Sequence, residues 1–503
     1  MSKLAIENQK NNTNYKINLQ DPNPNLNTQA SNNPNSSKNF SLIPIAAVIG
    51  ISLILALVLS LVICLSNKNN KHYTLRAFNS TSIEKDNSII ANYIINKGDE
   101  DTLLFHQSYL DSIESIKING NDVNITNTKT FENSGNNQVE IKFKDKLTSL
   151  ESLFLNCHNL NEIDLYNLTT ENVDSTAEMF RGCNNLEKIN FGDFETKNIK
   201  NISNMFFGCE KLTSIDVSFF ENDKLVDIQG LFLNCGKLTK INFGNFNTNN
   251  VINMSKLFSG CTSLTEIDIN EDNNFKTENV KDMSYMFHSC SNLESLNLNN
   301  LDTSNVIHMN NMFDNCVNLK ELNLKSFNTK NVENMFFMFG NCSKLESLDL
   351  SNFDTSKTKD MFGMFKDCIN LKNLDVSNFD TSSANDMGEM FGNCKNLNNI
   401  QISNFDVKNV KSMLGMFQKC NSLASLNVPN FDTQNLKEAS YLLSNCEKIS
   451  HLDFTKFNTM KLEIYDNIFE NIPNEGTIIC DKTIFNITGE LPRDWTVKDI
   501  NEK

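Results

Sequence analysis

The sequence predicts an α/β repeat solenoid in which each unit adds one parallel strand and one short helix, preceded by one N-terminal transmembrane helix. Three observations carry this prediction. Cysteines recur at a fixed interval over about two thirds of the chain. Other apolar residues keep fixed offsets from each cysteine. An uncharged apolar run, Ile43 to Leu65, lies upstream of the repeats.

The composition already excludes some classes of protein. The chain has 503 residues, and 45 Lys+Arg against 61 Asp+Glu give a formal net charge of −16. A nucleic-acid-binding protein needs a basic surface to neutralise phosphate, so this charge argues against one. With 39% hydrophobic and 21% charged residues, wholesale disorder is also excluded. The 36 Phe, 17 Met and 14 Cys beside one Trp indicate one small motif copied many times.

The cysteines reveal the repeat. From Cys157 to Cys446 the step between successive cysteines is 26 residues, except for one step of 29 between Cys261 and Cys290. Twelve cysteine-anchored units therefore follow one another. Their cysteines are Cys157, Cys183, Cys209, Cys235, Cys261, Cys290, Cys316, Cys342, Cys368, Cys394, Cys420 and Cys446.

The residues before each cysteine predict a short helix. In the unit of Cys316, Val306, Met309, Met312 and Phe313 lie at spacings of three, three and one, and the cysteine follows three residues later. This spacing is typical of the apolar stripe of a helix. The segment Asp302 to Asn305 supplies residue types that cap helix N-termini.

The residues after each cysteine predict a short half-buried strand. Leu319, Leu322 and Leu324 end in an alternating pair, as expected where one face of a strand is buried. One such unit cannot bury its apolar face alone. Neighbouring units must therefore stack into a solenoid.

These units resemble a known repeat family. Segments such as MFDNCVNLKELNLKSFNTKNVENM and MFGNCSKLESLDLSNFDTSKTKDM resemble the BspA-like leucine-rich repeats of bacterial and protist surface proteins. The resemblance covers residues 146–473. It implies a leucine-rich-repeat solenoid exposed on a cell surface, in proteins commonly linked to adhesion or recognition. Residues 66–145 are interpreted as a juxtamembrane stalk and β-rich leader or cap, and 474–503 as a C-terminal cap.

The first 65 residues have a different character. Residues 1–42 are rich in Asn and have no apolar period, which predicts a disordered tail. The 23-residue run 43–65 is long enough for a helix to cross a hydrocarbon core of about 30 Å. A cleavable signal peptide is the alternative, but the run is too long and lacks a small-x-small exit. Lipidation at Cys64 fits poorly, because no small residue precedes it.

The flanking charges and the family resemblance predict opposite orientations for this anchor. Lys38 lies before the run, whereas Lys68, Lys71 and Arg76 lie after it. The positive-inside rule would then place the solenoid in the cytoplasm, although the rule weakens for long translocated domains. The resemblance to surface proteins favours the opposite topology, an external solenoid with a cytoplasmic tail.

The cysteine column is interpreted as a buried ladder of free thiols. Each cysteine ends an apolar stripe, and cysteine packs well as a small hydrophobe. Disulfides remain an alternative if neighbouring cysteines approach within about 7 Å. Zinc is the third alternative, but the sequence has no CxxC or HxxxH spacing. No metal and no cofactor is therefore predicted.

Catalysis has no support in the sequence. The six histidines occupy no shared column, and no GxSxG, P-loop, HExxH or Gly-rich dinucleotide motif is present. The chain is therefore predicted to be a binding protein and not an enzyme.

The candidate binding surface is the exposed strand face. The residue seven positions after each cysteine points away from its apolar neighbours. The residue five positions after each cysteine is also polar. The exposed strand face is the usual binding surface of curved solenoids. The alternative interpretation is a solvated face that only keeps the solenoid soluble. The candidate ligand face comprises Asp164, Asn190, Asp216, Asn242, Asp268, Asn297, Asn323, Asp349, Asp375, Asn427 and Asp453.

Two functions remain open from the sequence. The first is a membrane-anchored cell-surface protein that binds a protein ligand, or a host or cell-surface component, for adhesion or recognition. The second is a structural coat or spacer without a dedicated ligand. Few aromatic residues reach the strand face, so a protein partner is favoured over a sugar.

Overall fold

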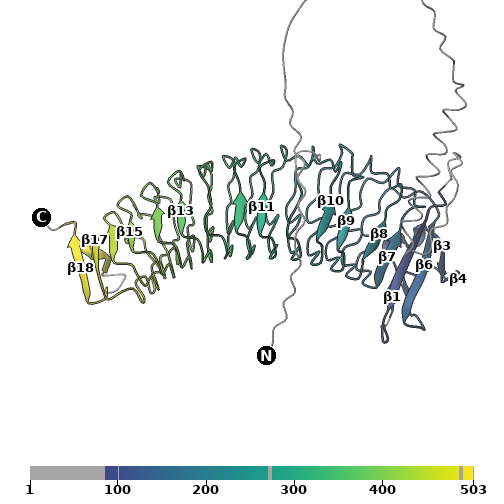
Figure 1. Ribbon diagram of the computed structural model, residues 1–503, viewed down its shortest axis with the longest axis horizontal. Helices are drawn as coiled ribbons and strands as arrows, with labels where there is room; N and C mark the ends of the chain where they lie inside the picture. The colour runs from purple at the N-terminus through teal and green to yellow at the C-terminus, as the bar shows by residue number, and fades with distance from the viewer. Residues whose placement is uncertain (1–84, 100, 270–274, 486–490, 502–503) are drawn as a thin grey trace, which may run out of the picture. The chain divides into compact units, whose positions relative to one another are not determined.

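The computed structural model describes residues 85–99, 101–269, 275–485 and 491–501, all within one compact unit from Ile83 to Lys503. In this unit the chain winds into stacked coils (Figure 1). The predicted tail and the predicted membrane helix at 43–65 lie outside the described residues. Within the described ranges, no helix is long and apolar enough to cross a membrane.

A mixed sheet begins the unit; its strands pair antiparallel except for the parallel pair β7 (Leu160–Asp164) and β8 (Lys188–Asn190). Its strand order is β4-β3-β6-β1-β7-β8, and β1 joins it to the coils by pairing with both β6 and β7. β1 alternates strictly, with Ile89, Ala91 and Tyr93 buried, as expected for a strand with one face in the core. The elements are β1 (Ser88–Ile95), β2 (Thr102–Leu103), the 3-10 helix η1 (Gln107–Ser112), β3 (Ile113–Ile118), β4 (Asn121–Val123), β5 (Thr128–Lys129) and β6 (Gly135–Phe143).

One side of the coils carries the predicted parallel strands. In each three-residue strand, the central residue is at least partly buried between polar neighbours, because alternate side chains point to opposite faces. The strands are β7 (Leu160–Asp164), β8 (Lys188–Asn190), β9 (Ser214–Asp216), β10 (Lys240–Asn242), β11 (Ser295–Asn297), β12 (Glu321–Asn323), β13 (Asn373–Asp375), β14 (Asn399–Gln401), β15 (Ser425–Asn427) and β16 (His451–Phe454).

The prediction of one strand in every unit is wrong for two coils. In the 29-residue unit of Cys261, the described segment 264–269 forms no strand, and in the unit of Cys342 only a single bridge joins Ser347 to Asn373. The strand side is therefore divided into short sheets, with β9–β10, β11–β12 and β13–β14 each paired alone.

The predicted short helices are wrong. The helices among the described residues are two 3-10 helices, η1 and η2 (Lys482–Ile484). Before each cysteine the chain instead makes successive tight turns. Met179 N–H donates to the Thr176 carbonyl (3.2 Å) and Cys183 N–H to the Phe180 carbonyl (3.0 Å). These three-residue steps bury apolar side chains at nearly the spacing of a helical stripe, which is why the sequence pattern resembled a helix.

Two left-handed residues in each coil make these turns possible. They lie five residues and one residue before the cysteine, as Glu178 (φ 56°) and Gly182 (φ 74°) do before Cys183. Asn and Gly tolerate this conformation best, and they fill most of the column directly before the cysteine. A Cβ at Gly182 would come within 2.3 Å of Asn156 Oδ1, so a larger residue there would have to displace the Asn156 side chain. That Asn/Gly column is the sequence signal against a helix.

The remaining backbone groups of these turns bond from coil to coil. Phe180 N–H donates to the Met205 carbonyl of the next coil (2.9 Å), and Gly182 N–H to the Phe207 carbonyl (2.7 Å). We call this array the turn ladder; it joins residues 148–156 of the first coil, through every coil between, to residues 464–471 of the last. Four N–H groups in each coil point toward the C-terminal end. Unlike the strand side, the turn ladder is continuous.

The core between the two sides consists of repeated columns. Adjacent phenylalanine rings stack with centroids 5.5 to 6.0 Å apart. All thirteen cysteines in the described ranges are free and buried, which confirms the predicted burial of the cysteine column. Each repeat thiol from Cys183 onward donates to a phenylalanine carbonyl of the preceding coil, as Cys316 does to Phe287 (3.1 Å). The stack comprises Phe154, Phe180, Phe206, Phe232, Phe258, Phe287, Phe313, Phe339, Phe365, Phe391 and Phe417.

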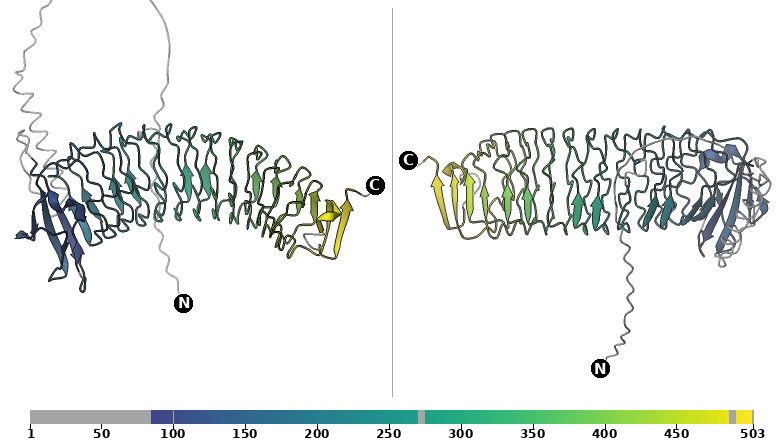
Figure 2. Two further views of the ribbon diagram at one scale, coloured as in Figure 1. Left: turned by 180° about the vertical axis from the view of Figure 1, so that it is seen from behind. Right: turned by 45° about the horizontal axis from the view of Figure 1, so that its top comes forward.

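The C-terminal end of the strand side is extended by two longer strands. β17 (Glu475–Cys480) pairs in parallel with β16, and β18 (Asp494–Asp499) pairs with β17. Trp495 is buried there and its indole Nε1 donates to the Pro473 carbonyl (2.8 Å). Both strands lie at the C-terminal end of the row of coils (Figure 2).

Candidate functional site on the strand face

The predicted ligand face lies on the strands. Each of its members lies one residue beyond the apolar centre, and all but Asp453, which precedes the last residue of β16, end a short strand or the equivalent extended segment. Most are exposed, whereas Asp164, Asn323 and Asp453 are half-buried. The structure thus brings the column together along one face, with Asn190 Nδ2 bonded to Asp164 Oδ1 of the preceding coil (3.0 Å).

Many of these side chains also stabilise the backbone. The Oδ1 of Asp349 accepts from the Ser351 N–H (3.1 Å) and the Ser351 hydroxyl (2.7 Å), and Asp375 accepts from the Ser377 N–H (3.0 Å). This contact between a side chain and the N–H two residues later closes a turn after the strand. Asp and Asn in this column therefore stabilise the turn after the strand, and one oxygen of each such side chain is already in use.

The same contacts keep the aspartates charged. The Ser351 hydroxyl and N–H hold the pKa of Asp349 below its usual range, and Ser377 does the same for Asp375. Burial of Asp216 favours its neutral form, but hydrogen bonds from Ser218 and Asn242 outweigh it and lower its pKa. These carboxylates are therefore negative at neutral pH.

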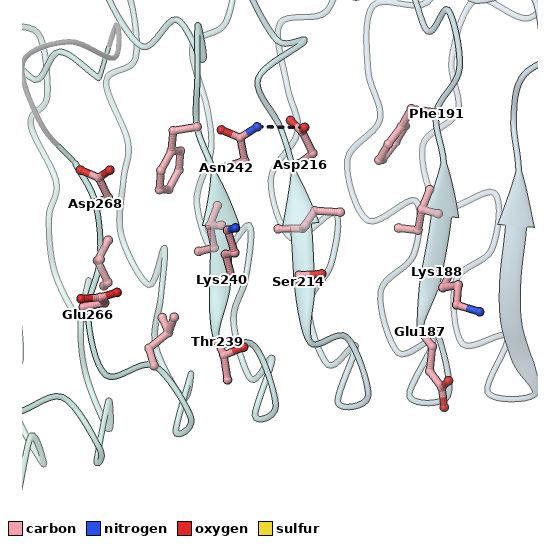
Figure 3. A pocket seen from close by; sticks show the side chains of 16 residues that line it. Glu187, Lys188, Phe191, Ser214, Asp216, Thr239, Lys240, Asn242, Glu266 and Asp268 are labelled. Atoms are coloured by element: carbon pink, nitrogen blue, oxygen red, sulfur yellow. Dashed lines mark hydrogen bonds between the residues drawn. The ribbon is translucent and has the colours of Figure 1, made fainter. Parts of the chain in front are cut away.

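A hollow of about 1090 Å³ opens on this face over β8, β9, β10 and residues 264–268 (Figure 3). It coincides with the breaks in strand pairing, because β8 and β9 belong to different sheets and the segment after β10 is not a strand. Three members of the predicted column line it: Asp216, Asn242 and Asp268. Asn242 Nδ2 donates to Asp216 Oδ2 of the preceding coil (2.9 Å).

The hollow has an apolar floor. Ile189, Ile215, Ile241 and Ile267 occupy the central position of successive coils and line it together. Ile189, Ile241 and Ile267 are only partly buried, whereas most residues at the central strand position of the other coils are buried. Partly exposed apolar side chains in a row can contact apolar groups of a ligand that lies across the strands.

Charged groups of both signs surround this floor. Lys240 and Glu266 lie on neighbouring coils on one side of it, and Glu187 lies near its lower edge in Figure 3. Within the described part of the chain, none of these three side chains forms an ion pair or hydrogen bond. They are available to contact a ligand. Lys188, also on this rim, is paired with Glu162 (2.6 Å).

The sequence identified only part of this site. The Asp/Asn column was found because it alternates with buried residues. The polar column two residues earlier, with Lys240 and Glu266, was predicted to share this face but was not among the candidate ligand residues, and the isoleucine floor was assigned to the core. A smaller hollow of about 320 Å³ lies over β11 and β12 and includes Asn297 and Asn323. In the ranges that the structure describes, no group of three or more His, Cys, Asp or Glu side chains could hold a metal ion.

The repeats match a known family. The family described as "Mycoplasma protein of unknown function, DUF285" matches residues 148–271, 264–374 and 364–478, which is more than half of the chain. The chain belongs to the DUF285 family. The DUF285 region begins at the first coil, includes the whole strand face and ends within β17. No curated protein matches the sequence.

Several solved structures are similar to this DUF285 chain. A leucine-rich cell surface protein from Faecalibacterium prausnitzii A2-165 is 17% identical, with 52% of this chain and 77% of that chain covered and a TM-score of 0.27. TLR13 in its complex with ssRNA13 is 13% identical (67% and 50% covered, TM-score 0.22). A chain of the Toll–Spatzle complex from Drosophila is 14% identical (68% and 39% covered, TM-score 0.22). The matched region thus spans half of the TLR13 chain and less of the Toll-complex chain.

Proposed function

We propose that this chain is a membrane-anchored cell-surface protein that recognises a protein ligand through its exposed strand face. The observation that carries the proposal is the hollow over β8 to β10, where an isoleucine floor is bordered by Lys240, Glu187 and Glu266. Mixed charge around an apolar strip suits a protein surface, since protein interfaces combine an apolar centre with a polar rim.

The anchor in this proposal is the apolar segment 43–65, with the coils outside the cell and the Asn-rich tail inside. The resemblance of the repeats to BspA-like surface proteins supports this topology, and the length of the apolar segment supports a membrane span. Adhesion to a host or cell-surface component is the activity we propose for the hollow.

A charge swap tests the hollow. In Lys240→Glu/Glu266→Lys the net charge of the chain is unchanged, but the pattern of charge beside the floor is reversed. Cells displaying the full chain should adhere to protein-coated surfaces and to cell monolayers, and the swap should weaken adhesion by about tenfold or more, since misplaced charges at an interface cost several kcal/mol. The measurement is adhesion per displayed molecule.

The matched control is Lys281→Glu/Glu278→Lys. Both residues are exposed and lie in a coil of the array, away from the hollow lining, and this swap also leaves net charge unchanged. It should adhere like the parent. Equal adhesion of the parent and the hollow variant would favour the alternative function, a coat or spacer without a dedicated ligand.

A further inference from the structure

The N-terminal edge of the turn ladder is capped. Its first coil offers the carbonyl oxygens of Ser149, Glu151, Leu153 and Leu155 outward, and leader residues satisfy the first three. His106 N–H donates to the Leu153 carbonyl (2.8 Å), and the Tyr109 hydroxyl donates to the carbonyls of Glu151 (2.9 Å) and Ser149 (3.3 Å). Tyr109 is itself buried, so this cap is part of the core. A partner cannot add to the ladder at this end without displacing η1.

At the C-terminal edge of the same ladder, the residues that the structure describes supply no such cap. In the preceding coil, Tyr441 N–H donates to the Asp466 carbonyl (2.8 Å) and Asn445 N–H to the Glu470 carbonyl (2.7 Å). The equivalent N–H groups of the last coil belong to Tyr465, Asn467, Phe469 and Asn471. Among the described residues none of these four finds an acceptor. β17 and β18 extend the strand side only. Phe485, after β17, packs near the ring of Phe469 (6.5 Å between centroids), but no described backbone carbonyl accepts from the four N–H groups.

The side chains at this edge are unusual for the array. Met460, Ile464 and Tyr465 are 88%, 49% and 37% exposed and are three of the eight large hydrophobic residues that are exposed among the described residues. Two exposed acidic residues, Asp466 and Glu470, follow them in the chain. A row of N–H donors with adjacent apolar side chains is the kind of edge to which an extended segment adds.

We propose that the C-terminal edge of the turn ladder, residues 460–471, binds an extended segment of a partner protein that carries apolar and basic side chains. The carbonyl oxygens of that segment accept from the four free N–H groups and continue the ladder by one row. Its apolar side chains cover Ile464 and Tyr465, and its basic side chains lie against Asp466 and Glu470.

A second copy of this chain does not fit the same edge. Head-to-tail stacking would need four free carbonyls at the first coil, but His106 and Tyr109 already bond three of them. Joining two C-terminal edges would oppose donors to donors and acidic residues to acidic residues. The chemistry of the edge therefore calls for a different chain with free carbonyls and positive charge.

A segment of the chain itself provides the probe. The peptide 410–420, VKSMLGMFQKC, presents the carbonyls of Ser412, Leu414, Met416 and Gln418 to the preceding coil at 2.6 to 3.0 Å, and it contains two lysines. A synthetic copy with Cys420→Ser should bind the full chain purified in detergent. Amide hydrogen exchange should slow at residues 465–471 when the peptide is added, because the free N–H groups gain acceptors.

Two variants of the full chain make the test specific. Ile464→Lys/Asp466→Lys should bind the peptide at least tenfold more weakly, and a peptide with Lys411→Glu and Lys419→Glu should bind this variant better than the parent peptide does. The control Ile252→Lys/Glu278→Lys makes the same exchange at an exposed isoleucine and an exposed acid within the array, and should bind like the parent. Unchanged exchange at 465–471 with saturating peptide, or equal binding by both variants, would overturn the proposal.

Discussion

Replacing Phe339 by Ala should lower the free energy of unfolding by about 3–5 kcal/mol, the range for emptying a buried aromatic site. Phe339 is fully buried and its ring stacks between Phe313 and Phe365, at 5.7 and 5.5 Å. In a solenoid each coil contacts only its neighbours, so the loss should also destabilise the adjacent coils. Denaturant unfolding and hydrogen exchange of the full chain measure the two effects.

Two further substitutions in the coil of Phe339 provide reference values for this loss of stability. Phe336 lies three residues earlier in the same coil and is only half-buried, so Phe336→Ala should cost much less. Phe339→Leu should recover most of the stability, because Leu443 fills the equivalent position in its own coil and is fully buried. An unfolding curve for Phe339→Ala that matches that of Phe336→Ala would contradict the stacked core.

Raising the pH from 8.5 to 10.5 should destabilise the coils steeply. Burial raises the pKa of Cys235, Cys290 and Cys368 to about 12, whereas an unfolded thiol ionises near pH 8.5. Between these values the unfolded chain binds fewer protons than the folded chain, so the free energy of unfolding falls by about 1.4 kcal/mol per pH unit for each thiol. Below about pH 8.5 the contribution is fully present.

The effect is large because the thiols are repeated. A cooperative unit of about four coils would lose about 6 kcal/mol per pH unit in this window. Denaturant unfolding under reducing conditions at several pH values measures the slope. In Cys368→Ala one titrating thiol is gone, so the slope should be shallower by about 1.4 kcal/mol per pH unit in the unit that contains it. A free energy of unfolding that stays constant from pH 8.5 to 10.5 would contradict the buried thiol column.

The repeat length and its buried columns were predictable because they depend on spacing alone. The constant spacing of the cysteines gave the length of each coil, and the alternation of Leu322 and Leu324 around Asn323 identified the strand. The local conformation before the cysteine was not predicted, since consecutive three-residue turns and a helix bury apolar side chains at almost the same positions. The deciding residues are the left-handed ones, such as Asn315 (φ 63°) and Asn341 (φ 50°), which a helix does not accommodate.

The candidate site was predictable only in part. Asp216 and Asn242 were found because strand alternation places them outside, but the bond between them depends on how close adjacent coils lie. The isoleucine floor depends on the breaks in strand pairing around β9 and β10, which arise from packing between coils. Ile189 and Ile241 have the same sequence pattern as the buried Leu374, so the sequence alone could not distinguish them.

Protease added to intact cells tests most directly whether the coils face outward. With the topology proposed here, the coils should be digested while an epitope in the Asn-rich tail, residues 1–42, survives until the membrane is permeabilised. The charges Lys68, Lys71 and Arg76 favour the opposite orientation. Coils that resist protease on intact cells, and are digested only after permeabilisation, would contradict surface recognition by this chain.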